Sequence, residues 1–484
     1  MNLRLLLKIF GLLLVIFSFS MIPPIFVSIL LENQRELDAF THTFAIVITL
    51  GAALWLPLRN YQRELRTREG FIIVALFWVV FSALGSIPFM LSHSLSMSFT
   101  DAFFESMSGF TTTGATVISG LDSLPKSILF YRQQLQWLGG MGIIVLAVAV
   151  LPVLGVGGMQ LFKAEAPGPI KDAKLTPRIT GTAKALYSIY LVITILCALA
   201  YWAGGMSGFD AVAHSLSTVA NGGFSTHDQS FAWFDSARLE LIAIFFMALS
   251  GVNFALHYGA WHSKSLKAYW RDTEFRAYLW ILLGASALIF IYLSIHDGFP
   301  YVFEDLHHGP FQLVSFMTTS GFGVADFVNW PDFIPVLLVF SGFIGGCAGS
   351  TAGGLKVVRV VLLAKQSARE IKALVHPTAQ LPIMLGDVQV SEKVTNAVWG
   401  FFGLYVASFV IMMLLMMAAD VDQVTAFSAV AACINNVGPG LGDVASSFAG
   451  MTDPVKWLSA FAMLLGRLEI FTVLVLFSPT FWRA

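Results

Sequence analysis

The chain has 484 residues, of which 57% are hydrophobic and only 12% are charged, and its formal net charge is −1. Soluble globular proteins carry about 25% charged residues, so this composition excludes an ordinary soluble domain. A mean hydropathy of +0.76, together with repeated apolar runs long enough to cross a bilayer, predicts a polytopic membrane protein. We expect lipid as its surroundings and no nucleic-acid partner.

The apolar runs predict membrane-crossing helices along the whole chain. In chain order they lie at roughly 3–31, 40–58, 70–92, 128–152, 184–203, 238–258, 277–296, 333–375 (interrupted), 393–418 and 455–479.

The basic residues sort to one side of these predicted spans. They form four groups, Arg59/Arg63/Arg66/Arg68, Lys163/Lys171/Lys174/Arg178, Lys264/Lys267/Arg271/Arg276 and Lys356/Arg359/Lys365/Arg369/Lys372. The positive-inside rule places these groups and both termini in the cytoplasm. Acidic residues, Asp101, Glu105, Asp210 and Asp422 among them, fall on the other side, where a negative mouth would concentrate cations.

Four short polar segments between the spans can be aligned on a glycine. The segments are DAFFESMSGFTTTG, DAVAHSLSTVANGG, HGPFQLVSFMTTSG and TAFSAVAACINNVG, which end at Gly114, Gly223, Gly321 and Gly438. Two residues before the glycine stand Thr112, Asn221, Thr319 and Asn436, and six before it stand Ser108, Ser217, Ser315 and Ala432. Small residues can serve simple helix packing, but four matching segments favour a repeated structure.

The predicted fold is therefore an all-α polytopic membrane protein with four tandem helix–pore helix–helix repeats around one pore. Two extra helices precede the repeats. The predicted boundaries are 1–69 for this extension, then 70–182, 183–275, 276–392 and 393–484 for the repeats.

Non-helical backbone at membrane depth is tolerated where it is buried in protein or lines water. Four such turns around one axis would form a ring of carbonyls that can replace the hydration shell of an ion. Pore helices that direct their C-terminal ends toward that axis would favour a cation. The four segments thus indicate an ion-selectivity filter.

Two further features lie on the predicted pathway. The eighth span is broken by GGCAGSTAGG, which contains Gly345, Gly346, Gly349, Ser350, Thr351, Gly353 and Gly354. Five glycines in ten residues cannot hold a stable helix, because each costs about 1 kcal/mol relative to alanine. The segment is either a packing kink or a flexible loop that gates the pore.

Arg467 lies within the last span, where a charge marks a functional candidate or a structural ion pair. Glu469 is two residues away and so on a different helix face, which disfavours a local pair. Lys356 is interpreted as an interfacial residue.

The fourfold unit on one chain resembles the Trk/Ktr/HKT superfamily of potassium transporters, over essentially the whole sequence. The two extra leading helices resemble its TrkH-type membrane subunits. The resemblance implies a glycine-loop gate, a pore-facing Arg467 and four filter glycines, at Gly114, Gly223, Gly321 and Gly438. It also implies filter walls, and thus K⁺ contacts, at Thr112, Thr113, Ala220, Asn221, Gly222, Thr319, Ser320, Asn436 and Val437. Gly114 resembles the potassium-selective members, whereas sodium-selective plant relatives carry serine there. Pro439 and NNVGPG make the fourth segment the most divergent.

The resemblance further implies K⁺ as the transported ion, a bacterial inner-membrane location, a homodimer and a cytosolic nucleotide-binding Trk regulatory subunit. A Na⁺-conducting or K⁺/Na⁺-coupled relative remains an alternative, as does a secondary solute transporter, whose broken helices form inverted pairs.

No Ser-His-Asp or Cys-His arrangement stands out, and GPGLG follows no strand, so we expect no enzyme. His257, His262, His307 and His308 show no metal-ligand spacing, and the three cysteines suggest neither a disulfide nor a metal site.

Overall fold

The computed structural model describes residues 3–31, 34–61, 67–145, 179–295 and 307–483. The regular secondary structure of this part of the chain is helical except for a small antiparallel hairpin, in which β1 (Met384–Leu385) pairs with β2 (Val388–Gln389). The three cysteines are buried and free of disulfides. The predicted basic group at 163–178 lies outside the described residues.

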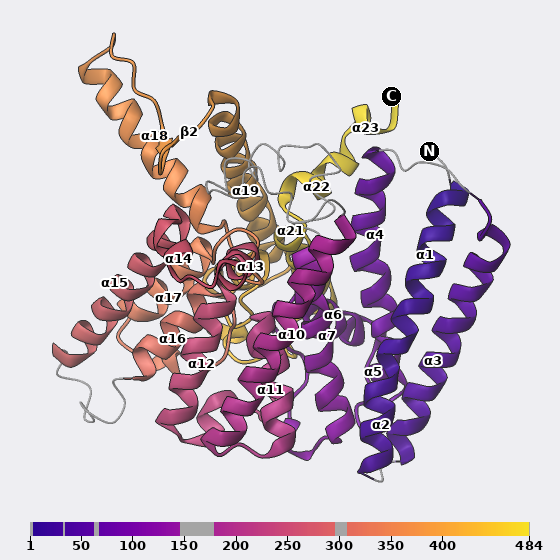
Figure 1. Cartoon of the computed structure of the whole chain (residues 1–484). Coiled ribbons are helices and arrows are strands. Elements are labelled where there is room, and N and C mark those ends of the chain that lie inside the picture. The colour runs from indigo at the N-terminus through magenta and orange to yellow at the C-terminus, as the bar shows by residue number, and fades with distance from the viewer. Residues whose placement is uncertain (1–2, 32–33, 62–66, 146–178, 296–306, 484) are drawn as a thin grey trace.

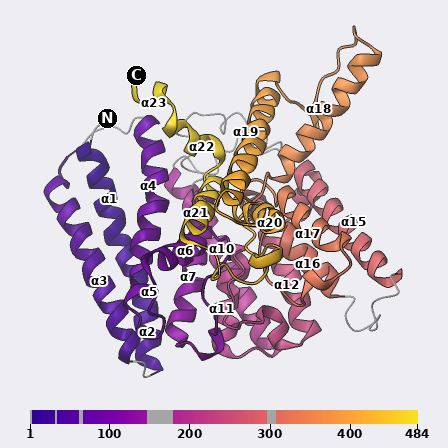
Figure 2. The ribbon, with the colours of Figure 1, turned by 180° about the vertical axis from the view of Figure 1, so that it is seen from behind.

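A helical hairpin at the N-terminal end stands beside the rest of the molecule (Figures 1 and 2). It consists of α1 (Leu3–Ser18), η1 (Phe19–Met21), α2 (Ile22–Leu30), α3 (Gln34–Trp55) and η2 (Leu56–Leu58). Prolines occupy the first turn of α2, where a missing N–H costs no helical hydrogen bond, so Leu3–Leu30 continues as one apolar span. Gly11 and Gly51 let the two helices approach closely, because a Cβ at either would collide with the backbone of the other helix.

The same order of elements then occurs four times: a long helix, a short buried helix, an extended turn and another helix. Unit 1 contains α4 (Thr67–Gly85), α5 (Ile87–Leu91), α6 (Phe99–Phe110), η3 (Leu121–Ser123) and α7 (Lys126–Val145). Unit 2 contains α10 (Ile179–Gly204), α11 (Gly208–Ala220), η6 (Ser230–Phe234), α12 (Ala237–Ser250), α13 (Phe254–Ser263) and α14 (Lys267–Arg271).

The other two units follow the same order with longer C-terminal parts. Unit 3 contains α15 (Thr273–Ile295), α16 (His308–Met317), η7 (Phe327–Asn329), α17 (Phe333–Ile344), α18 (Val357–Val375) and the β-hairpin. Unit 4 contains α19 (Glu392–Met417), α20 (Gln423–Ile434), η8 (Gly442–Val444), α21 (Asp453–Arg467), α22 (Ile470–Leu474), η9 (Val475–Phe477) and α23 (Pro479–Arg483). In Figure 1, α1 begins and α23 ends at the same end of the molecule, from which α18 also projects.

Six described helices are long and apolar enough to cross a membrane, or eight spans if each of two bent pairs counts as one. The bent pairs correct two predicted spans. The helix expected at 238–258 bends by 93° between α12 and α13, and the one expected at 455–479 bends by 113° between α21 and α22. The predicted span 128–152 is α7 as far as Val145, and its remainder lies outside the described residues.

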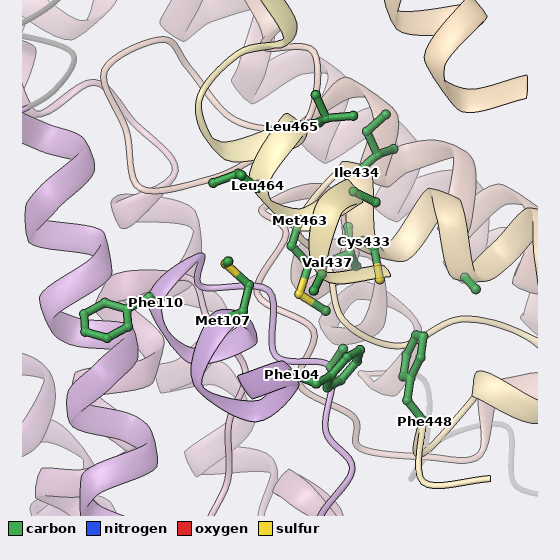
Figure 3. Close-up of a cluster of buried hydrophobic side chains, with 14 of the residues drawn as sticks. Phe104, Met107, Phe110, Cys433, Ile434, Val437, Phe448, Met463, Leu464 and Leu465 are labelled. Atoms are coloured by element: carbon green, nitrogen blue, oxygen red, sulfur yellow. The ribbon is translucent and has the colours of Figure 1, made fainter. Parts of the chain in front are cut away.

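The short helices α6, α11, α16 and α20 hold the centre of the fold and are almost wholly buried. Unit 4 closes against unit 1 through apolar side chains. Figure 3 shows Phe104 and Met107 of α6 near Val437 after α20 and Met463 of α21. Phe448 packs on Phe104 with ring centroids 5.3 Å apart. The first and last units are therefore neighbours, which closes the arrangement of the four units.

Candidate functional site

The four short helices begin at polar residues, as their sequences favour. The Ser98 hydroxyl caps α6 by accepting from the Asp101 N–H at 3.2 Å, and Ser207 caps α11 in the same way at 3.1 Å. Asp422 caps α20 by accepting from the backbone N–H groups of Val424 at 2.9 Å and Thr425 at 3.1 Å. Hydrogen bonds from the Thr425 side chain and N–H hold the pKa of Asp422 below its usual value.

The four helices end in the same hydrogen-bonded turn. The carbonyls of Ser108, Ser217, Ser315 and Ala432 accept, five residues on, from the N–H groups of Thr113 (2.9 Å), Gly222 (2.9 Å), Ser320 (2.7 Å) and Val437 (2.8 Å). This bond encloses a second one between residues three apart in sequence, such as that from the Thr112 N–H to the Gly109 carbonyl. The two bonds together define a Schellman C-cap. Because it uses only the backbone, Ala432 serves as well as the three serines.

The residue inside each C-cap has a left-handed backbone. The φ angles are 50° at Thr112, 52° at Asn221, 56° at Thr319 and 55° at Asn436. The aligned glycines follow two residues later with φ angles of 84° at Gly114, 79° at Gly223, 77° at Gly321 and 98° at Gly438. Four segments that are distant in sequence therefore share one backbone conformation, at the offsets that the alignment predicts.

These glycines lie against one another's turns in a closed ring. A Cβ at any of the four would come within 3.0 Å of a carbonyl oxygen in the next unit, nearer than real Cβ atoms come. Gly114 faces the oxygen of Gly222, Gly223 that of Ser320, Gly321 that of Val437, and Gly438 that of Thr113. Each oxygen belongs to the residue immediately before a ring glycine, so the order runs through units 1, 2, 3, 4 and back to 1.

Side-chain hydrogen bonds occur within the turns and also join one turn to the next. The Thr111 and Thr113 hydroxyls are 2.8 Å apart, and Thr318 and Ser320 repeat the contact in unit 3 at 2.9 Å. The Asn436 amide donates to the Thr113 hydroxyl at 3.0 Å, which links unit 4 to unit 1. Polar side chains that the sequence places apart are thus brought together around one centre.

Unit 2 differs because two consecutive residues of its turn, Gly222 and Gly223, have no side chain. Gln136 of α7 fills the space, and its amide donates to the Gly222 carbonyl while its Oε1 accepts from the Phe224 N–H at 3.1 Å. A Cβ at Gly222 would overlap Gln136. The predicted wall residue Ala220 is the last residue of α11 and is fully buried.

A buried ion pair supports the first turn and was not predicted. Arg132 Nε lies 2.8 Å from Glu105 Oε1, and both side chains are at most 1% exposed. Arg132 also donates to the Ser225 carbonyl at 3.1 Å, and Glu105 accepts from the Val117 N–H at 3.0 Å. The sequence analysis counted Glu105 among the acids on the outer side and did not pair it with Arg132. The structure buries both, because α6 and α7 pack together behind the turn.

Some buried polar atoms at the ring have no hydrogen-bond partner within the described part of the chain. They include Thr112 Oγ1, Asn221 Nδ2 and Asn436 Oδ1, all from residues with left-handed backbone. Such atoms require an explanation, for which bound water or an ion is an ordinary one.

The glycine-rich segment between α17 and α18, residues 345–356, is called the glycine loop here. It is not a packing kink, because the helix ends at Ile344 and does not resume until Val357. Gly345, Gly349 and Gly354 have φ near 73°, and the loop's centre at Ser350, Thr351 and Ala352 is fully buried.

The glycine loop contacts the undersides of three turns. The Gly353 N–H donates to the Thr319 hydroxyl at 2.6 Å, and the Gly354 N–H donates to the Asn435 carbonyl at 3.1 Å. The Thr351 hydroxyl approaches the Val219 carbonyl at 3.0 Å. The loop therefore lies directly against the C-terminal ends of α11, α16 and α20.

The two ends of the glycine loop are hydrogen-bonded to each other, to unit 2 and to α15. The Cys347 N–H donates to the Gly251 carbonyl at 2.8 Å, and the Gly346 carbonyl accepts from the Val357 N–H at 3.0 Å. The buried Glu274 carboxylate accepts from the N–H groups of Ala348 and Val358, at 2.7 and 3.2 Å. Sequence reasoning missed Glu274, because nothing near it in the sequence points to the loop.

Arg467 reaches the glycine loop from unit 4. It is the last residue of α21, and its Nη2 donates to the Thr351 carbonyl at 3.0 Å. Its side chain is buried, and its Nε has no partner in the described residues. A guanidinium thus binds the centre of the loop directly below the ring.

The acid near Arg467 pairs elsewhere, as its position predicts. Glu469 lies beyond the bend after α21 and contacts Arg359 of α18 at 2.7 Å. Arg359 itself is buried on α18 and is therefore not part of an exposed basic loop. Lys356 was expected to be interfacial, but its ammonium donates back to the Ala352 carbonyl within the glycine loop.

Residues 36–484 match the family model described as "TrkH: Cation transport protein". The chain belongs to this family.

Curated relatives cover the full chain. The chain is 52% identical over 486 residues to "Trk system potassium uptake protein TrkH" of Vibrio parahaemolyticus, with all of both chains covered. It is 51% identical over 483 residues to the protein of that name in Escherichia coli K12, again with full coverage. It is 43% identical to "Trk system potassium uptake protein TrkG" of E. coli K12, covering 98% of this chain and 97% of that protein.

A solved structure has the same fold. The crystal structure of the potassium transporter TrkH from V. parahaemolyticus superposes with a TM-score of 0.93 at 50% identity, with all of both chains covered. The all-α polytopic membrane fold expected from the sequence, and the superfamily that it resembles, are therefore confirmed.

Proposed function

We propose that this protein is a potassium-uptake subunit that conducts K⁺ inward through a single pore at the centre of the four turns. The observation that carries the proposal is the closed ring in which each unit's glycine faces the carbonyl of the next. In this proposal the four units are the predicted repeats at 70–182, 183–275, 276–392 and 393–484. The curated relatives named above carry potassium uptake in their names.

The ring offers backbone oxygens in place of water. Removing K⁺ from water is costly, and closely spaced carbonyl dipoles offset that cost. We assign the K⁺ contacts to residues on both sides of each left-handed turn, at Thr112, Thr113, Asn221, Gly222, Thr319, Ser320, Asn436 and Val437. The buried oxygens without partners at Thr112 and Asn436 support a hydrated or ion-filled centre, and the unpaired amide N–H of Asn221 supports water there.

The helix dipoles favour a cation at the same place. All four short helices end at the ring, and the C-terminal end of a helix carries roughly half a negative charge. Their N-terminal ends are satisfied by Ser98, Ser207 and Asp422 in three of the four units. Four such termini around one axis stabilise a positive charge there and disfavour an anion.

The glycine loop and Arg467 form the gate in this proposal. The loop lies against the inner side of the ring, and Arg467 adds a positive charge that repels K⁺ from the same place. Opening then requires Thr351 to leave the Val219 carbonyl and the Arg467 guanidinium. Gly345, Gly346, Gly349, Gly353 and Gly354 supply the backbone freedom for that movement.

The driving force is electrical in this account. A membrane potential that is negative inside is worth about 2.3 kcal/mol per charge per 100 mV, which is enough to concentrate K⁺ without chemistry. By the positive-inside rule, the predicted basic groups support a bacterial inner-membrane location with both termini on the cytoplasmic side. A cytosolic nucleotide-binding Trk regulatory subunit would bind the exposed basic residues on that side, and two copies of this chain would form a homodimer.

A Na⁺-conducting or K⁺/Na⁺-coupled activity is the alternative. The observation in its favour is unit 4, where Val437 stands in place of the hydroxyl residues Thr113 and Ser320 and is followed, after Gly438, by Pro439. A secondary solute transporter is less well supported, because the four turns share one backbone conformation and are not two inverted pairs.

Cation flux into proteoliposomes tests the proposal. Uptake of K⁺, Rb⁺, Na⁺ and Li⁺ is compared for wild type, Gly114→Ser and Gly120→Ser. Gly120 is the matched control, since its φ of 75° is close to that of Gly114 but only the Ser123 side chain, at 3.6 Å, lies near a Cβ there. Both variants carry the same backbone strain, and only Gly114→Ser presses a side chain on the Gly222 carbonyl.

We expect wild type and Gly120→Ser to prefer K⁺ and Rb⁺ strongly, and Gly114→Ser to lose most of that preference. A change of about 1.4 kcal/mol in relative binding is already tenfold in selectivity. Equal Na⁺ and K⁺ flux in wild type would favour the alternative. Equal effects of the two substitutions would show that the ring geometry does not set selectivity.

A further inference from the structure

The fold brings together a glutamate and two histidines that the sequence analysis did not connect. Glu240 lies in the first turn of α12 in unit 2, and His307 and His308 stand at the start of α16 in unit 3. His307 Nε2 is 3.1 Å from Glu240 Oε2, and His308 Nε2 is 3.4 Å from Glu240 Oε1. The one ligand atom that each residue offers lies within 4.8 Å of the other two.

From this geometry we propose that Glu240, His307 and His308 form a binding site for a divalent transition metal of the Zn²⁺ class. The site lies away from the ring and the glycine loop and is independent of the ion that the pore conducts. A donor set of two imidazoles and one carboxylate binds Zn²⁺ in preference to Mg²⁺ or Ca²⁺, because the latter two take oxygen ligands.

The distances fit a shared ion. Zn–N and Zn–O bonds of about 2.0–2.2 Å at tetrahedral angles place neighbouring ligand atoms about 3.3–3.5 Å apart. The two nitrogen–oxygen separations, 3.1 and 3.4 Å, each to a different oxygen of Glu240, lie at or near that range, and one ligand atom from each residue lies within 4.8 Å of the others. The ligand set would be three protein groups and a water molecule, as in zinc sites that keep one open position.

An ordinary ion pair explains the cluster less well. Glu240 is only 4% exposed, yet its Oε2 has no hydrogen-bond donor among the residues that the structure describes, although His307 Nε2 is close. A buried carboxylate oxygen without a donor is costly, and a metal ion between it and the imidazole would remove that cost. The histidines are 26% and 21% exposed, so an ion can enter from solvent.

The site joins two units. A bound ion would tie the start of α12 to the start of α16, and α16 ends at the ring. Binding to the folded protein alone also stabilises it by mass action. A metal effect on thermal unfolding is therefore expected together with stoichiometric binding.

The test uses the full-length protein in detergent, without a polyhistidine tag and after removal of metals by a chelator. Zn²⁺ alone is titrated by calorimetry and by competition with a chromogenic zinc indicator. The variants are Glu240→Gln, His307→Ala and His308→Ala. The control is His262→Ala, which removes an exposed histidine on α13.

We expect wild type and the control to bind one Zn²⁺ per chain and to unfold at a higher temperature with it. Each site variant should bind about 100-fold more weakly, since loss of even an outer-shell partner costs 10–100-fold. Absence of binding in wild type, or unchanged affinity in Glu240→Gln, would overturn the proposal. Anomalous scattering at the zinc edge in wild-type crystals gives a second test, because a peak anywhere but between these three side chains also refutes it.

Discussion

The buried pair between Glu105 and Arg132 gives the sharpest test of how the first turn is supported. Arg132 Nε and Glu105 Oε1 are 2.8 Å apart with both side chains excluded from solvent. The proposed perturbation is Arg132→Met, Glu105→Gln and the two together. Each single change leaves one ionised group buried without its partner, whereas the double change removes both charges.

The magnitude follows from the remaining contacts. Removing one partner of a buried pair costs about 3–5 kcal/mol. The Val117 N–H still donates to Glu105 after Arg132→Met, and the Ser225 carbonyl still accepts from Arg132 after Glu105→Gln. Each single change should therefore lie near the lower end, about 3 kcal/mol. The double variant should also cost about 3 kcal/mol, which gives a coupling energy of about 3 kcal/mol.

Unfolding in mixed micelles, followed by tryptophan fluorescence, measures these free energies. The ion pair between Lys456 and Asp101 is the control, because it also joins α6 to a neighbouring helix, at 2.6 Å, but is partly exposed. Its coupling should be at most about 1 kcal/mol. Single variants of the buried pair should also lose cation selectivity, since the pair supports the turn that contains Gly114.

Additive effects at the buried pair, within about 0.5 kcal/mol, would refute this reasoning. Such a result would mean that water or an unseen partner already compensates both charges. A coupling energy at Lys456 and Asp101 as large as that at the buried pair would also contradict it, because burial would then have no role.

Three further outcomes are expected. Arg467→Gln should raise basal K⁺ flux in proteoliposomes by roughly 5–30-fold, since lowering a barrier by about 1–2 kcal/mol does so; unchanged flux would remove Arg467 from the gate. Thr351→Val should destabilise the closed loop by about 1–3 kcal/mol, because it deletes the hydroxyl that approaches the Val219 and Ser250 carbonyls. Its basal flux should rise, and flux equal to wild type would show that this contact does not hold the loop closed. Ser207→Ala should lower the free energy of unfolding by about 1 kcal/mol through loss of the α11 cap, while Ser207→Asn should retain it; equal loss in both would mean that the cap is not the cause.

The backbone of the four glycine turns could be predicted because it is a local property. A left-handed residue followed by a glycine with positive φ has a sequence signature, and four copies made it readable. Thr112 and Asn436 lie where the alignment put them, with φ of 50° and 55°. The glycine loop was also predictable, since five glycines cannot continue α17.

Contacts between distant segments could not be predicted. Arg132 and Glu105 are brought together by packing of α6 on α7, and no periodic pattern marks their pairing. The cluster of Glu240 with His307 likewise depends on how unit 2 meets unit 3. Neither pair is readable from spacing, because each joins different helices.

The two bent spans had weak local signals that hydropathy alone hides. Asn253 caps α13 by accepting from the Ala255 N–H at 2.8 Å, and asparagine after Gly251 is a typical helix start. Glu469 adopts a φ of 58° at the second bend, which its sequence does not announce. An apolar run shows that a segment lies in the membrane and leaves open whether it is straight.

The central claim is that the ring formed by the four turns holds the conducted ion. Anomalous diffraction from crystals grown in Rb⁺ tests it most directly, because Rb⁺ replaces K⁺ and can be located without a model of the site. The account predicts a peak at the centre of the ring, among the carbonyl oxygens of Thr113, Gly222, Ser320 and Val437, that weakens in Gly114→Ser. Rb⁺ located elsewhere, with none at this centre, would contradict it.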